Sequence, residues 1–135
     1  MSMNRKICLF PLFTLALLVA ASAWSAEAAH RGFKLTGVFS DMRYAREGGD
    51  VLGQEVFIVY SKDGYFAVLQ SSEGEPGKPV IVPVALVGAS VTFRVPGDVD
   101  ARGEFHGVIS KDRLIGRFEG NGQVVDLMRR SSYWQ

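Results

Sequence analysis

The sequence predicts an all-β domain, and three observations carry that prediction. Eight short segments rich in Val, Ile, Phe and Tyr follow residue 30, and no helical period appears among them. Tight turn pairs separate several of these segments, and apolar side chains alternate with polar ones along the later segments. Sequential tight hairpins favour an eight-stranded antiparallel up-and-down meander closed into a small barrel, with a β-sandwich as the alternative.

Each predicted strand is bounded by a tight turn or a longer connection. The predicted strands are Lys34–Tyr44, Gln54–Tyr60, Tyr65–Ser71, Val80–Val87, Ser90–Val95, Gly103–Ser110, Arg113–Glu119 and Gln123–Arg130. Three connections suit two-residue hairpins, because glycine reaches the positive φ that these turns need. They are Asp63-Gly64, Gly88-Ala89 and Asn121-Gly122.

Glycines interrupt the apolar face of two late strands. Gly107 follows Phe105 on one such face, and Gly116 precedes Phe118 on the next. Glycines inside strands are typical of places where a sheet bends tightly or where a large neighbour needs room. We therefore expect both glycines to lie at a tightly curved part of the barrel.

The lengths of the connections predict one closed rim and one open mouth. Consecutive connections of a meander alternate between the two rims. Three tight turns, Asp63-Gly64, Gly88-Ala89 and Lys111-Asp112, fall at one rim, whereas the other rim receives Ala45–Gly53, Ser72–Pro79 and Pro96–Arg102. Binding residues concentrate on loops that a rigid scaffold positions, so we expect a binding site at the mouth. The alternative is that these loops merely tolerate insertions.

The N-terminal residues have the pattern of a secretory signal peptide. Arg5 and Lys6 precede the apolar run Ile7–Ala20, and small residues follow it. A membrane span needs about 20 apolar residues, so an uncleaved anchor is the less favoured alternative. Cleavage after Ala23 or Ala28 fits the small-x-small rule, with Ala28 slightly preferred.

The expected division is a signal peptide at 1–28 and one domain at 29–135, in the periplasm or outside the cell. Cys8 is the one cysteine and lies within the predicted signal peptide, so the mature domain is expected to fold without disulfides. Basic and acidic residues are nearly balanced, at 15 and 14. This balance argues against nucleic acid as a partner, and we expect a monomer that does not bind membranes after cleavage.

Acidic residues outnumber basic ones in the expected mouth loops. The acids are Glu47, Asp50, Glu73, Glu75, Asp98 and Asp100, against the bases Arg46, Lys78 and Arg102. An acidic rim favours a cationic partner by electrostatic steering. The alternative is a solvated rim that keeps the domain soluble.

The first predicted strand carries the candidate ligand-binding residues. Phe39, Asp41 and Arg43 alternate on one face, and Glu55 on the next strand could join them. Charges inside a barrel must pair with one another or with a ligand, because an isolated buried charge is very costly. A bulge after Phe39 that turns both charges outward is the equally weighted alternative.

No catalytic or metal site is predicted. His30 and His106 have no partner at the spacing of metal ligands, and no nucleophile motif is present. Asp98–Gly103 matches only the first half of a calcium loop, because Ile109 stands where the bidentate acid is needed. The sequence therefore predicts a protein that is not an enzyme and has no cofactor. Near the C-terminus, Trp134 is expected to fold back and close the barrel rim rather than to dock a partner.

Gly37-Val38-Phe39 at the first strand, eight meandering strands and Arg129 or Arg130 at the last strand resemble the calycin superfamily. This superfamily includes lipocalins, avidins and small bacterial protease inhibitors. The resemblance implies a barrel in which the early aromatic, here Phe39 rather than the usual Trp, stacks under a late Arg. It implies a non-enzymatic binding protein with a small ligand in its interior or at its mouth. The alternative is an inhibitor of an envelope or host hydrolase that acts through the acidic mouth loops.

Overall fold

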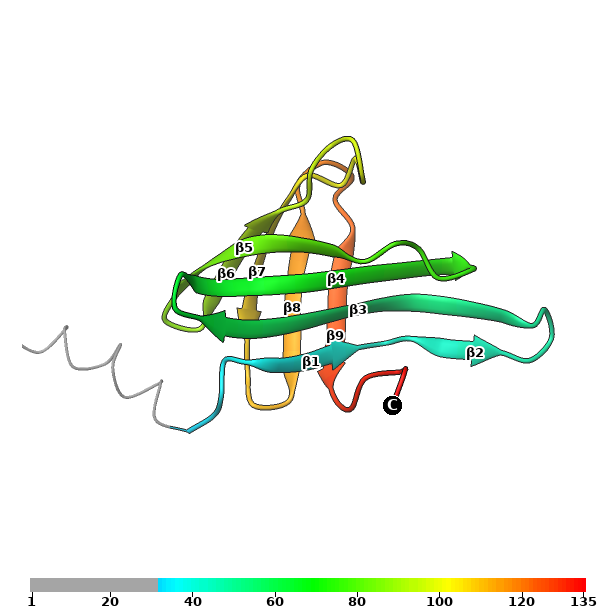
Figure 1. Ribbon diagram of the computed structural model, residues 1–135, viewed down its shortest axis with the longest axis horizontal. Coiled ribbons are helices and arrows are strands. Elements are labelled where there is room, and N and C mark those ends of the chain that lie inside the picture. Colours follow the sequence, from blue (N-terminus) through cyan, green and yellow to red (C-terminus); the bar gives the residue numbers. More distant parts are fainter. Residues whose placement is uncertain (1–31) are drawn as a thin grey trace, which may run out of the picture.

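A computed structural model describes residues 32–135 and shows a closed antiparallel barrel (Figure 1). Its strands are β1 (Gly37–Ser40), β2 (Arg43–Ala45), β3 (Asp50–Ser61), β4 (Gly64–Gly74), β5 (Val80–Val87), β6 (Ser90–Arg94), β7 (Glu104–Ile109), β8 (Arg113–Phe118) and β9 (Val124–Arg129). Neighbours in sequence pair from β3 to β9, and β1 closes the sheet by pairing with both β9 and β3. The predicted eight-stranded meander is confirmed, and the β-sandwich alternative is wrong.

The predicted signal peptide, its cleavage sites, Cys8 and His30 lie outside the described residues. Within residues 32–135, no helix has the length and apolar character needed to span a membrane.

The predicted first strand is divided into β1 and β2, which follow one line along β3. The register against β3 is the same on both sides of the interruption at Asp41 and Met42. Phe39, Asp41 and Arg43 therefore share one face of the sheet, and the alternative of a bulge that turns both charges outward is wrong.

β3 and β4 extend well beyond the barrel wall. They pair from Val51↔Gly74 to Ser61↔Gly64, whereas β5 pairs only with Tyr65–Leu69 of β4. Together with β2, the free parts of β3 and β4 form a three-stranded projection that Figure 1 shows at the C-terminal end of β4. We call this part, Arg43–Ala45, Asp50–Gly53 and Gln70–Gly74, the mouth extension. Much of the chain predicted as long loops is thus strand.

Phenylalanine side chains fill the barrel interior. Phe93 stacks on Phe105 with ring centroids 4.7 Å apart, and Phe118 lies 5.1 Å from Phe105. All three side chains are buried. A Cβ atom on Gly107 would lie 2.6 Å from Phe105 Cε1, and one on the facing Gly116 would also meet this ring. The two glycines make room for the Phe105 ring, which agrees with their predicted role at a crowded, curved part of the sheet.

Arg129 closes the barrel base beneath the first strand. Its guanidinium lies 4.5 Å from the centroid of the buried Phe39 ring and donates hydrogen bonds to the carbonyls of Thr36, Lys34 and Lys111. Burial lowers the pKa of Arg129 from its usual value, and the nearby carboxylate of Asp112 opposes that shift. The expected stacking of the early aromatic under a late arginine is present.

The C-terminal tail folds back over the outer wall of the barrel, next to β1 and β3 (Figure 1). The buried Glu55 carboxylate accepts hydrogen bonds from the Ser132 hydroxyl at 2.6 Å and the Tyr133 N–H at 2.9 Å. Trp134 Nε1 donates to Gln70 Oε1 at 2.8 Å, and half of the Trp134 side chain stays exposed. Trp134 therefore folds back, as predicted, but it lies on the outer wall rather than over the rim.

Candidate functional site

A cleft of about 950 Å³ opens between the mouth extension and the loops that precede β7 and β9. Asp41 contributes from the interruption between β1 and β2, Arg43 from β2 and Glu73 from β4. The opposite side comes from Asp100–Arg102 and from the β8–β9 turn. A cleft is therefore present at the predicted mouth.

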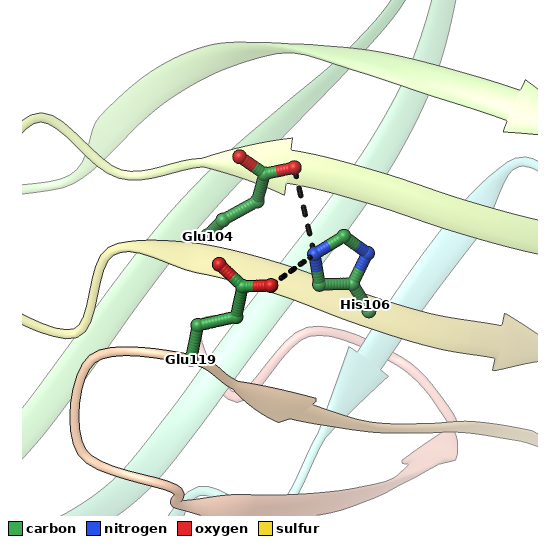
Figure 2. A group of neighbouring side chains, drawn as sticks. All are labelled: Glu104, His106 and Glu119. Carbon is green, nitrogen blue, oxygen red and sulfur yellow. Dashed lines mark ion pairs between the residues drawn. The ribbon is translucent and has the colours of Figure 1, made fainter.

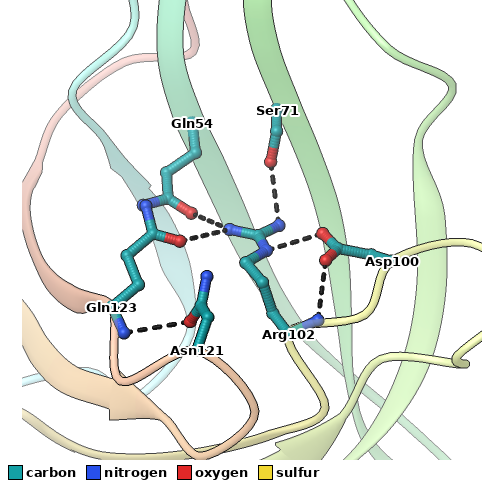
Figure 3. A network of polar contacts seen from close by, with 6 residues as sticks. All are labelled: Gln54, Ser71, Asp100, Arg102, Asn121 and Gln123. Carbon is teal, nitrogen blue, oxygen red and sulfur yellow. Dashed lines mark hydrogen bonds and ion pairs between the residues drawn. The ribbon is translucent and has the colours of Figure 1, made fainter.

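Arg102 forms the centre of this cleft (Figure 3). Its Nε donates to Asp100 Oδ2 at 2.6 Å, and its two terminal nitrogens donate to Gln54 Oε1 at 2.9 Å and Ser71 Oγ at 3.0 Å. A longer contact of 3.4 Å reaches Gln123 Oε1. The Arg102 side chain is only 13% exposed. Through these contacts it connects four segments of the chain at the floor of the cleft.

The interior of the barrel is closed off below Arg102. Its guanidinium carbon lies 4.4 Å from the centroid of the Phe118 ring, which belongs to the packed phenylalanine cluster. The floor of the cleft is therefore a cation–π contact, and apolar side chains fill the space beneath it. A small ligand has room in the cleft above Arg102 rather than among the phenylalanines.

The three predicted ligand-binding residues are divided between two faces. Asp41 and Arg43 line the cleft, and Asp41 Oδ1 accepts a hydrogen bond from the Gln54 N–H at 2.6 Å. Glu55 points the other way, toward the outer wall, and holds the C-terminal tail with both of its oxygens. The expectation that Glu55 joins Asp41 and Arg43 is therefore wrong, because successive residues of β3 face opposite sides of the sheet.

The acidic residues predicted at the mouth differ in their relation to the cleft. Glu73, Glu75 and Asp100 line the cleft, whereas Glu47, Asp50 and Asp98 do not. Asp50 begins β3 and Glu73 lies within β4, so both are held by strands rather than by loops. All six except Asp100 are exposed.

The segment Asp98–Gly103 forms a turn that its own residues complete. Asp100 accepts from the Arg102 backbone N–H at 2.9 Å and also pairs with the Arg102 side chain. The Asp100 carboxylate thus satisfies a backbone group of the turn, as Asp side chains often do. Sequence reasoning placed Arg102 among the rim bases and did not identify it as the central residue of the site.

His106 has acidic neighbours that its sequence spacing did not indicate (Figure 2). Its Nε2 lies 3.0 Å from Glu119 Oε1 and 3.5 Å from Glu104 Oε1. Glu119 is 13 positions away along the chain, yet it lies directly opposite Glu104 where β7 meets the end of β8. Along the sequence His106 has no partner at the spacing of metal ligands, and the pairing of β7 with β8 is what brings Glu119 to it.

Comparisons of the chain with protein-family models, curated proteins and solved structures gave no match. The residues of the cleft themselves therefore carry the functional argument.

Proposed function

We propose that this chain is a non-enzymatic binding protein that takes a polar, cationic ligand in the cleft at its barrel mouth. The observation that carries the proposal is the cleft itself, which is about 950 Å³ in volume and lies above a filled interior. Ligand sites typically measure about 300–1,000 Å³, so the cleft can take a whole small molecule or a few side chains of a peptide.

The charges of the cleft favour a cation. Arg102 is neutralised by Asp100 at the floor. The remaining charged groups of the lining are Asp41, Glu73 and Glu75, against Arg43 alone. Among the described residues, none of these four side chains forms an ion pair. Three free carboxylates against one guanidinium leave the cleft acidic, which attracts amines and repels anions.

The floor of the cleft supplies polar recognition next to this charge. The amide side chains of Gln54 and Gln123 stand beside the guanidinium, and Ser71 adds a hydroxyl. These groups orient hydrogen-bonding ligands, and the surface they form is unsuited to a purely apolar molecule. An amine that also carries hydroxyl or amide groups fits this lining best.

We infer a relationship to calycins at the level of architecture. The closed eight-stranded meander supports it, and so does the contact of Arg129 with Phe39 beneath the first strand. The signal-peptide pattern at residues 1–28 further supports a place of action in the periplasm or outside the cell.

A second candidate function is inhibition of an envelope or extracellular hydrolase through the mouth. The mouth extension favours it, because the exposed Asp50 begins β3 at its tip and Glu47 lies in the adjacent turn. Acidic residues that stand beyond the cleft can contact a basic protein surface that is too large to enter it.

Native mass spectrometry of the protein recovered from its export route, without a denaturing step, tests the proposal. We expect a reproducible small-molecule adduct that is lost in a Glu73→Gln/Glu75→Gln variant, and saturable binding of spermidine as a model polyamine. Removing both carboxylates should weaken spermidine binding about tenfold or more. Asp63→Asn, at an exposed acid in the β3–β4 turn of the opposite rim, is the matched control and should bind as the parent does.

A bare mass together with no saturable spermidine binding would overturn the small-ligand proposal. Capture of a basic hydrolase by the parent, but not by a Glu47→Lys/Asp50→Lys variant, would instead favour the inhibitor.

A further inference from the structure

We propose that Glu104, His106 and Glu119 form a binding site for a divalent transition-metal ion, with Zn²⁺ as the best fit. The site lies on the outer face of β7 and at the end of β8, apart from the mouth cleft (Figure 2). It does not depend on the proposed binding function.

The distances within the group match those of a metal site. One ligand atom from each residue lies within 4.8 Å of the others. Both carboxylates approach the same imidazole nitrogen, with Nε2 3.0 Å from Glu119 and 3.5 Å from Glu104. Ligand atoms about 2.1 Å from a tetrahedral zinc ion stand roughly 3.4 Å apart. Small side-chain rotations therefore suffice to place all three around one ion.

The backbone fixes these side chains on one face. Glu104 and His106 are two positions apart in β7 and so point to the same side of the sheet. The Glu119 N–H donates to the Glu104 carbonyl at 2.8 Å, which holds the two glutamates directly opposite one another. Carboxylates in such cross-strand pairs repel one another, and a bound cation removes this cost.

The other groups on this face leave the ligand atoms available. Arg94 pairs with Oε2 of Glu104, so Oε1 remains turned toward the imidazole. Thr92 Oγ1 lies 3.5 Å from His106 Nδ1 and can accept its hydrogen when Nε2 binds a metal. Arg117 lies opposite His106 in the register, and its positive charge moderates the affinity of the site.

The ligand set selects the kind of metal. One imidazole and two carboxylates suit Zn²⁺ and its late first-row neighbours, whereas Ca²⁺ and Mg²⁺ prefer oxygen ligands alone. Three protein ligands leave a fourth tetrahedral position for water or an external group. The ion would connect the start of β7 to the end of β8. This place is close in the chain to Arg102, and the Gly120 N–H donates to the Arg102 carbonyl at 2.9 Å.

Zinc titration of the chelator-treated full chain tests the site, by calorimetry and by competition with a chromogenic chelator. The chain has two histidines, His30 and His106, so single substitutions separate them. We expect one saturable Zn²⁺ site that is lost in His106→Ala and kept in His30→Ala. Glu119→Gln should weaken binding at least about tenfold, since even partners outside the first ligand sphere are typically worth that much.

The thermal midpoint gives a second readout. Zn²⁺ should raise it in the parent and in His30→Ala, but not in His106→Ala or His106→Gln. Both His106 variants should have the metal-free midpoint of the parent, because the side chain is exposed. Unchanged Zn²⁺ affinity in His106→Ala, loss of binding in His30→Ala, or displacement of Zn²⁺ by equimolar Ca²⁺ would overturn the proposal.

Discussion

Substitution of Gly107 by alanine is expected to destabilise the barrel, although alanine is normally the better residue in a strand. Glycine in a strand costs about 0.5–1 kcal/mol relative to alanine, because it loses more backbone freedom on folding. At Gly107 an added Cβ would lie 2.6 Å from Phe105 Cε1 and 2.7 Å from the Ile115 carbonyl oxygen. Ordinary carbon contacts lie at about 3.5–4.0 Å. The methyl group would be caught between a buried ring and the neighbouring strand.

Overpacking of this kind costs about 1–3 kcal/mol, which exceeds the gain in backbone entropy. Urea unfolding followed by circular dichroism should therefore show a lower free energy of unfolding for Gly107→Ala by about 1–2 kcal/mol, once the gain in backbone entropy is subtracted from the packing cost. The thermal midpoint should fall by about 4 °C or more. Gly97→Ala is the control, because an added Cβ there meets no atom within 4 Å, and its effect should stay within about 0.5 kcal/mol.

A double substitution separates the contact with the ring from the contact with the backbone. Phe105→Leu removes the ring atoms that the new methyl group would meet, while the Ile115 carbonyl stays in place. We expect Gly107→Ala/Phe105→Leu to be more stable than the sum of the single effects by about 0.5 kcal/mol or more. Strict additivity, or equal stability of Gly107→Ala and Gly97→Ala, would refute the reasoning.

Three further predictions concern the two ends of the barrel and the tail. Arg129→Met should lower the free energy of unfolding by about 2 kcal/mol in urea, because backbone carbonyls at the base lose a charged donor and Phe39 loses its cation. Arg102→Met should increase amide hydrogen exchange at Val99 and Asp100 several-fold, since the loop loses its side-chain anchors; unchanged exchange would contradict the anchoring role. Glu55→Ala should release the tail and raise acrylamide quenching of Trp134, measured in the chain that begins at residue 29.

The sequence was sufficient for the architecture because its signals there are local. Hairpin pairs such as Gly88-Ala89, which forms the two-residue turn between Val87 and Ser90, and the alternation along β7 and β8 act over a few residues, and they predicted the meander, the two rims and the crowding at Gly107. Asn121-Gly122 lies instead in a longer turn, because β8 ends at Phe118 and β9 begins at Val124. The resemblance to calycins also led to the contact of Arg129 with Phe39. These features depend only on the order of the strands and on the alternation of side chains along each strand.

The site was less predictable because it depends on pairing across strands. Glu55 is expected beside Asp41 and Arg43 because it lies on the neighbouring strand, whereas its position in the register places it on the outer wall under the tail. Arg102 was counted as one rim base among several, and its contacts with Gln54 and Ser71 span 48 and 31 positions of the chain. Glu119 reaches His106 only because β8 ends opposite the start of β7. The alternation of side chains along a strand predicts the face of the sheet on which a residue lies. The register between strands is needed to identify its neighbours on that face.

The two ends of the barrel are closed by the same pair of residue types, and their differences determine where binding is possible. At the base, Arg129 covers Phe39 and is held by backbone carbonyls, which cannot move without moving the strands and turns that carry them. At the mouth, Arg102 covers Phe118 and is held by side chains, which can rotate toward a ligand.

An anion would have to compete with Asp100 for the Arg102 guanidinium and would also meet the acids of the rim. A cation can pair with those acids while the Arg102 contacts stay intact. The proposed selectivity for cations would therefore follow from how the barrel is closed, since the arginine that seals the interior is already neutralised.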